Sequence, residues 1–444
     1  MSLRLSKEHS FLSANLLFGV AIAGSQLNYM IVAFYNASDQ RMTLLFSPEF
    51  FAGIVFIAGV FYLNFNSSPK GHLQAACKSE GFWLLLLACW MTFSSLISLF
   101  FSLRYLFTFW APFMYYICSF KLMIQHSEDI TSKGHRALVI VMCCSLLFLL
   151  SFSMSGRITF SDAENIGIQK IGLGADLSST EIAIFTGMHI FYLTSILGNL
   201  QRIGYRIIVY TLLAVEFWLI VKLFSLSAFL ALFIVAVYYA VIALKQRNAR
   251  KAILLMISTI IIIPVFTYWL SDLSVTTVIL EKVQASVESK LNLQYQGYGR
   301  TVLTEYMLKL IRENPVFGIG FGQFYESNRL GWQQTKMPSH NNFLSLAVEN
   351  GLVCGILYFA FIASFLWSSI RTLIALPVVA RKQHFRLFWF TVAAVAIVIY
   401  QQIRGLFHDT WQIKELYIWA GLAAAGVRLL RIADDSKATT YKRN

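Results

Sequence analysis

Two residues of different chemical character stand at the ends of one polar stretch in a chain that is otherwise mostly apolar. Arg300 follows the glycine-containing segment QGYG, and His340 stands in the segment PSHNNF. A guanidinium group beside the free N–H groups of a helix start is suited to hold an anion such as a phosphate. A neutral imidazole accepts a proton near pH 7, because its ordinary pKa is about 6.5. The pattern favours an anion-binding cation and a general base at the two ends of one loop. The other interpretation is two surface side chains at helix starts.

Each of these two residues is expected to open a helix. The run TVLTEYMLKLIRENP after Arg300 has the 3.6-residue period of an amphipathic helix that Pro315 ends, and its apolar face suits a lipid interface or the flank of a membrane bundle. A second, short helix is expected over residues 341–349, with Ser339 as its N-cap. The amide of Asn341 would then lie beside His340, where it can orient the imidazole or bind substrate.

The sequence GIGFG over residues 318–322 lies between the two expected helices. Its spacing resembles that of a phosphate-binding loop, but no Lys-Ser/Thr pair follows it and no parallel sheet is expected around it. A tight loop after a helix is therefore the favoured interpretation.

The composition bounds the class of protein. Hydrophobic residues make up 57% of the 444 residues and charged residues only 13%, against about a quarter charged in a soluble domain. Apolar runs near 20 residues long recur along the chain, which indicates a polytopic membrane protein. The net charge of +14 is scattered through short loops, so membrane topology explains it better than a nucleic-acid partner does. The chain has neither a Cys-x-x-Cys pair nor an Asp-x-Asp motif, so we expect no metal site and no cofactor.

The predicted fold is all-α, with about twelve transmembrane helices and a large, partly helical outer loop. Lys and Arg gather in alternate segments, which places both termini on the cytoplasmic side. Residues 1–271 would hold the first nine spans with a smaller outer loop near 157–180, and residues 272–340 the large loop. Residues 341–432 would hold the last three spans, and 433–444 a cytoplasmic tail. The spans are predicted near 11–35, 43–63, 82–102, 105–124, 137–156, 181–200, 207–223, 224–244, 252–271, 350–370, 387–406 and 416–432.

Three further basic residues stand in or beside apolar segments. Arg404 lies near the outer end of a span, where an arginine is costly unless it is paired or functional, or unless it extends to the interface. Arg157, at the start of the smaller outer loop, has the same two interpretations. Lys222 and Glu216 are candidates for a buried charge pair between two spans.

The motifs together resemble the O-antigen ligase and O-antigen polymerase superfamily across residues 296–360. The resemblance rests on the succession of Arg300, a helix, Asn314-Pro315, Gly318-Ile319-Gly320-Phe321-Gly322 and Ser339-His340-Asn341, followed by Leu344, Glu349, Gly351 and Gly355. It implies a metal-independent, inverting glycosyltransferase of the bacterial inner membrane whose large loop faces the periplasm. The substrate would be a glycan carried on undecaprenyl pyrophosphate.

The resemblance also implies roles for single residues. His340 matches the loop histidine that is proposed to activate the acceptor hydroxyl, and Arg300 matches the loop arginine that is proposed to hold the pyrophosphate. Many members carry a Ser-Arg pair at the start of a middle span, whereas the segment LFSLSAFLAL over 223–232 has no arginine. Lys222 is a candidate to replace it. Arg157, Arg404 and Asn341 complete the expected substrate-binding set.

The leading hypothesis is a polymerase that joins lipid-linked repeat units, with a chain-length regulator protein as a further expected partner. A ligase that transfers the glycan to lipid A–core is the close alternative. A transporter of lipid-linked oligosaccharide is the alternative from another class, and it predicts internal repeats and a binding site at the membrane midplane. The sequence shows no internal repeat.

Overall fold

The computed structural model describes the protein in separate stretches. They are residues 14, 16–20, 48–63, 80–98, 103–132, 135–136, 138–144, 146, 159–162, 169–172, 179–197, 200, 202–223, 226–245, 300–324, 341–408, 410–411 and 413–441.

The described chain is helical apart from one pair of short strands. Its helices are α2 (Pro48–Leu63), α4 (Gly81–Ile97), α5 (Leu103–Ser132), α7 (Ser179–Leu197), α8 (Ile203–Leu223), α9 (Leu226–Leu244), α12 (Arg300–Glu313), α14 (Asn342–Asn350), α15 (Leu352–Ala375), α16 (Val378–Gln383), α17 (Phe385–Gly405) and α18 (Lys414–Tyr441). Strands β1 (Thr159–Asp162) and β2 (Gln169–Gly172) pair antiparallel, with Thr159 opposite Gly172. The all-α prediction is therefore confirmed for the body of the protein and wrong for this part of the smaller outer loop.

Five of the described helices are long and apolar enough to cross a membrane. These segments are Tyr105–Ser132, Ser227–Leu244, Leu352–Ala375, Phe385–Gly405 and Lys414–Asp434. Helices α2, α4, α7 and α8 each overlap a further predicted span. The predicted span 252–271 lies outside the described residues, and the spans near 11–35 and 137–156 are described only in part. The full set of twelve spans therefore stays a prediction.

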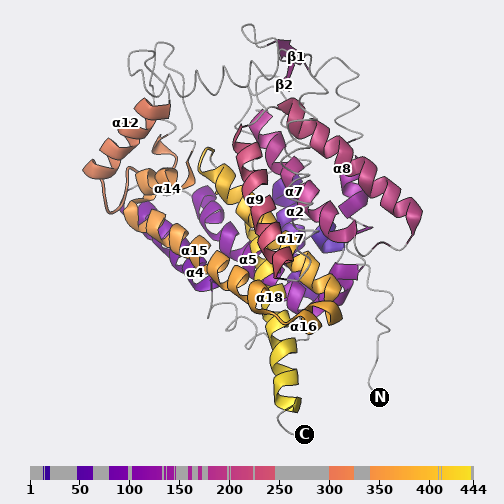
Figure 1. Ribbon diagram of the computed structural model, residues 1–444. Coiled ribbons are helices and arrows are strands. Elements are labelled where there is room, and N and C mark those ends of the chain that lie inside the picture. Colours follow the sequence, from indigo (N-terminus) through magenta and orange to yellow (C-terminus); the bar gives the residue numbers. More distant parts are fainter. Residues whose placement is uncertain are drawn as a thin grey trace.

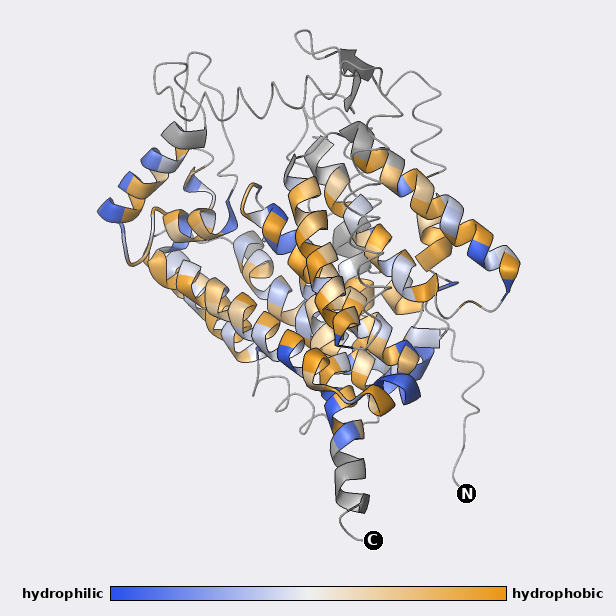
Figure 2. Ribbon diagram, viewed as in Figure 1, coloured by the Kyte–Doolittle hydropathy of each residue, from blue (hydrophilic) through white to orange (hydrophobic). Residues whose placement is uncertain are grey.

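The polar elements lie at the two ends of the helical bundle. Strands β1 and β2 and helix α12 lie at one end, and α16 lies at the other with the C-terminal part of α18 (Figure 1). Hydrophilic residues gather on α12 and near α16, while the long helices between them are mostly hydrophobic (Figure 2). The two segments predicted as long outer loops thus share one end of the molecule.

Helix α17 forms the centre of the bundle. Its residues from Phe390 to Gln402 are buried, and it packs against α7, α9 and α18. A helix that is apolar on all sides is expected to be enclosed in this way. Its two ends therefore have positions that are fixed by the surrounding helices.

Small residues let the helices of the bundle approach closely. A Cβ atom on Gly421 of α18 would clash with the main-chain oxygen of Tyr116 and lie 3.1 Å from the main-chain nitrogen of Phe120, both in α5. A Cβ atom on Gly426 would clash with Thr391 of α17. Glycine has this role in many membrane helix pairs, because packing rather than the hydrophobic effect holds helices together in lipid.

We predict that Gly421→Ala lowers the stability of the bundle. Backbone atoms cannot move aside like a flexible side chain, so α5 and α18 must separate, at a cost of about 1–3 kcal/mol. The measurement is the thermal unfolding midpoint of the purified protein in detergent. Gly204→Ala in α8 is the matched control, because no heavy atom lies within 4 Å of the added methyl group. Equal unfolding midpoints for the two variants would contradict the close packing of α5 and α18.

Candidate functional site

Helix α12 is the amphipathic helix that the sequence predicts after Arg300. Its buried residues Leu303, Met307 and Ile311 pack with Phe324 and with Val348 of α14. The apolar face of α12 therefore covers α14. The sequence suggested either a lipid interface or the flank of the bundle for this face, and the structure shows the flank of the bundle.

The glycine-rich loop after α12 is fastened to the end of α14. The N–H group of Ile319 donates to the carbonyl of Val348 at 2.9 Å, and that of Gly320 donates to the carbonyl of Glu349 at 3.0 Å. The carbonyls in the last turn of a helix need such donors, because they have no partner within the helix. These two N–H groups donate to carbonyls of the protein, so they do not form a phosphate nest. The interpretation of the segment as a tight loop is therefore confirmed.

Two glycines permit this close docking. Gly318 has φ +69° and Gly351 has φ +86°, in the left-handed region that favours glycine. A Cβ atom on Gly351 would clash with the carbonyl of Val316, and one on Gly318 would lie 2.5 Å from the carbonyl oxygen of Val348. The N–H group of Leu352 donates to the carbonyl of Pro315 at 2.8 Å, which completes the junction.

Asn341 is the N-cap of α14. Its Oδ1 accepts hydrogen bonds from the N–H groups of Phe343 at 3.0 Å and Leu344 at 3.1 Å, and its Nδ2 donates to the carbonyl of Leu406 at 3.3 Å. The prediction that Ser339 caps this helix is wrong, because the helix begins at Asn342 and the asparagine side chain has the capping geometry. Asn341, predicted to bind substrate, thus fixes the segment that follows His340.

Asn342 joins α14 to the turn after α17. Its side chain is fully buried; its Oδ1 accepts from the N–H groups of Thr410 at 2.6 Å and Trp411 at 3.0 Å. Its Nδ2 donates to the Thr410 hydroxyl at 2.9 Å and to the Tyr358 hydroxyl at 3.3 Å. Every donor and acceptor of the amide has a partner, as a buried amide requires.

The buried polar network continues from Asn342 into the bundle. The hydroxyl of Tyr358 lies 3.1 Å from both amide atoms of Gln402 on α17, and the Thr410 hydroxyl donates to the carbonyl of Gln401 at 3.3 Å. Sequence reasoning missed this network. The available signal was the pair of glutamines inside an apolar span, because polar residues in such segments need partners or have a function.

Arg404 is buried at the end of α17 that adjoins this network. Its side chain has no exposed surface, and its guanidinium donates a hydrogen bond to the hydroxyl of Ser227 in the first turn of α9. The same hydroxyl lies 3.5 Å from Nε2 of His408. The interpretation that Arg404 extends to the interface is therefore wrong. The structure brings Arg404, Ser227 and His408 together from two helices and the following turn.

The remaining predicted site residues are described in part or not at all. Arg300 is the first residue of α12 and Lys222 lies in the last turn of α8, but the described atoms do not include their side chains. His340 and Arg157 lie outside the described residues. Glu216, proposed as a partner of Lys222, is bonded to His189 of α7, with 2.8 Å between Nδ1 and Oε1. The described atoms thus leave His340 and Arg300 as predictions from the sequence.

Long apolar helices with a polar network at one end define a multi-pass helical membrane protein. Residues 209–359 match the model of a protein family described as O-antigen ligase, and the match confirms the resemblance to the O-antigen ligase and polymerase superfamily. Members of this family are glycosyltransferase-like enzymes. The matched region begins in α8 and ends in the second turn of α15, so it contains α9, α12, the glycine-rich loop and α14. No curated protein matches the chain.

We predict that Asn342→Leu destabilises the protein and lowers its activity. Leucine has a similar volume but no acceptor, so the N–H groups of Thr410 and Trp411 would stay buried without a partner, at a cost of about 1–3 kcal/mol each. The turn that follows Arg404 would shift away from α14. The measurement is the thermal unfolding midpoint together with glycan transfer. Asn314→Leu is the control, because the Asn314 side chain is exposed after α12. A variant Asn342→Leu as stable as this control would contradict the assigned role.

Proposed function

We propose that this protein is a glycosyltransferase that polymerises oligosaccharide repeat units carried on undecaprenyl pyrophosphate. One observation carries the proposal. The N-cap and the first residue of α14, Asn341 and Asn342, follow His340 directly in the sequence and are hydrogen-bonded to the turn that follows Arg404. Because His340 precedes Asn341 in the sequence, we place the candidate base at the same end of the bundle as this buried cation.

The proposed reaction needs a base that takes the proton of the acceptor and cations that stabilise the leaving group. The acceptor hydroxyl oxygen attacks the anomeric carbon of the donor glycan while His340 takes its proton. The bond from the anomeric carbon to the pyrophosphate oxygen breaks on the opposite face, so the anomeric configuration inverts. The electron pair leaves with the pyrophosphate, and arginine side chains stabilise the charge that develops there. In this proposal no metal ion is needed.

We assign to Arg404 the role of the arginine that many superfamily members carry at the start of a middle span and that this sequence lacks there. Helix α9 begins at Leu226 without an arginine of its own, and the guanidinium of Arg404 reaches its second residue, Ser227, from α17. The hydroxyl of Ser227 orients the guanidinium without cancelling its charge. A cation in a low-dielectric site attracts a phosphate more strongly than one in water does. Arg300 and Arg404 are thus the proposed pyrophosphate contacts, with Lys222 and Arg157 as further candidates.

The proposed topology has twelve spans in the bacterial inner membrane, both termini in the cytoplasm, and the α12 end in the periplasm. The common location of β1–β2 and α12 at one end of the bundle supports it, because the sequence places both segments in outer loops (Figure 1). The lipid tail of the donor would lie in the bilayer beside the helices.

A ligase that transfers the glycan to lipid A–core is the second candidate. The matching family model carries the description of an O-antigen ligase, which favours this alternative. The two reactions share the donor and the leaving group and differ in the acceptor. The experiment must therefore supply the two acceptors separately.

We predict that the purified protein converts lipid-linked repeat units into a ladder of products without lipid A–core. The ladder is read on a gel, and His340→Ala should abolish it, because a general base contributes about 10²–10⁴-fold to such a step. His340→Gln tests whether a polar side chain of similar size is sufficient for activity without a base, and this variant should also be inactive. A product that forms only after addition of lipid A–core would make the protein a ligase. The absence of product with either acceptor would favour transport instead.

We predict that Arg404→Gln lowers kcat/KM by about 10²–10³-fold, the cost of removing one donor to a developing negative charge. Arg404→Lys should retain part of the activity, because it keeps the charge and loses the planar fork. Arg312→Gln is the matched control, since Arg312 is exposed on α12. Thermal unfolding of each variant separates a loss of folding from a loss of catalysis. Full activity of folded Arg404→Gln would exclude Arg404 from the site.

A further inference from the structure

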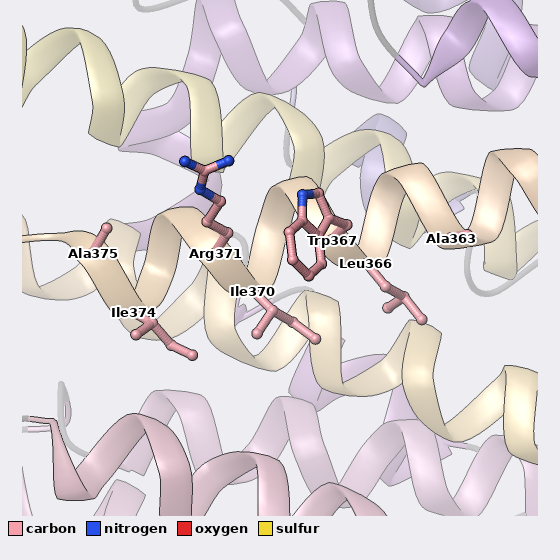
Figure 3. A pocket seen from close by; sticks show the side chains of 7 residues that line it. All are labelled: Ala363, Leu366, Trp367, Ile370, Arg371, Ile374 and Ala375. Carbon is pink, nitrogen blue, oxygen red and sulfur yellow. The ribbon is translucent and has the colours of Figure 1, made fainter.

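A groove runs along the exposed side of α15, away from the proposed active site. Its cavity of about 600 Å³ is lined by two rows of residues that repeat every four positions. One row is Ala363, Trp367, Arg371 and Ala375, and the other is Leu366, Ile370 and Ile374. Arg371 points to one side of the helix, Ile370 and Ile374 point to the other, and the ring of Trp367 lies between them (Figure 3).

The dimensions of the groove suit one hydrocarbon chain. Twelve residue steps along a helix span about 18 Å, close to half of the roughly 30 Å apolar thickness of a bilayer. The lining is apolar except for Arg371 near its C-terminal end. Trp367 is 70% exposed, and tryptophan is common where a membrane protein meets the lipid headgroups. The groove therefore fits an amphiphile within one leaflet.

Arginines of three helices lie near the C-terminal end of α15. Arg381 of α16 donates from Nη2 to the carbonyl of Ile374 at 2.9 Å, and Arg431 of α18 donates from Nη2 to the hydroxyl of Thr372 at 2.7 Å. Arg371 is exposed beside them. Both hydrogen bonds go to neutral acceptors, and Arg381 also lies over the ring of Phe388, 5.5 Å from its centroid. The close contacts to carboxylates found among the described residues, His189–Glu216 and Lys309–Glu313, involve none of these arginines. The end of the groove is therefore strongly positive.

Arg381 places a second positive charge close to the groove, since it donates a hydrogen bond to the carbonyl of the lining residue Ile374. Its side chain is 5% exposed, and its Nε and Nη1 atoms are buried without a hydrogen-bond partner among the described residues. A buried donor without an acceptor costs free energy, and the cost is larger for a charged group. A phosphate oxygen is an acceptor that suits the planar fork of a guanidinium group.

We propose that this groove binds an anionic phospholipid of the leaflet on the α16 side. One acyl chain would lie between the two rows of α15, and the phosphate would contact Arg371, which lines the groove, while the buried Arg381 adds to the positive potential there. Helix α16 supports this placement, because its exposed Val378 and Val379 suit the membrane interface. The polyprenyl-linked donor is a less suitable occupant, since its proposed site lies at the opposite end of the bundle. The inference does not depend on the proposed enzymatic function.

The test measures lipid binding to the purified full-length protein by native mass spectrometry and by the shift in thermal unfolding midpoint. Phosphatidylglycerol should bind and raise the midpoint, because a ligand that binds only the folded state stabilises it, whereas phosphatidylethanolamine should have little effect. Arg371→Gln should weaken phosphatidylglycerol binding about fivefold, the typical contribution of one basic side chain near anionic lipid. Ala363→Phe should also weaken binding by filling the groove, and it should fold because Ala363 is exposed.

Arg312→Gln is the charge-matched control at the other end of the molecule and should bind phosphatidylglycerol like the wild type. Equal effects of Arg371→Gln and Arg312→Gln would overturn the proposal, since general charge attraction would then explain the binding. Equal binding of the two phospholipids would overturn it as well. Displacement of phosphatidylglycerol by undecaprenyl phosphate at lower concentration would assign the groove to the polyprenyl lipid instead.

Discussion

The buried amide of Asn342 is the interaction on which the polar end of the bundle depends. An amide inside an apolar bundle is tolerated only when its donors and acceptors are all satisfied, and Asn342 meets this requirement with Thr410, Trp411 and Tyr358. Its partners belong to two separate parts of the chain, helix α15 and the turn after α17. Gly405 leaves room for the amide, because a Cβ atom there would clash with Nδ2 of Asn342. A single side chain thereby fixes α14 relative to the ends of α15 and α17.

The same requirement explains the glycine-rich loop and the break between α14 and α15. The carbonyls at the end of α14 lie where water has little access, so they need donors from the protein. The N–H groups of Ile319 and Gly320 provide them, and the left-handed conformations of Gly318 and Gly351 let the backbones approach. Helix α12 is thereby placed over α14 by backbone contacts as well as by its apolar face. The chain that leads to the candidate base His340 thus starts from α12, a helix that these contacts hold in position.

Buried or clustered charges lie at both ends of the helical bundle. Arg404 brings a cation into the bundle near α14, where a leaving pyrophosphate would need it. The arginines near α16 form a second positive region, whose position suits the headgroups of the opposite leaflet. The His189–Glu216 pair lies between α7 and α8 and joins α8 to the bundle. Inside the bundle this contact gives each side chain a polar partner, which a buried polar group needs.

The sequence by itself determined the class of protein, most helix positions, the amphipathic α12 and the resemblance to the O-antigen ligase and polymerase superfamily, because apolar runs, the 3.6-residue period and local motifs are all properties of neighbouring residues. It also identified Arg404 and the tight loop as features to explain. Only the tertiary structure decided that Asn341 rather than Ser339 caps α14, that Glu216 contacts His189, and that Arg404 reaches Ser227. The buried network around Asn342 was also decided at that level. These contacts join residues far apart in the chain, and their partners are selected by helix packing, which no local pattern records.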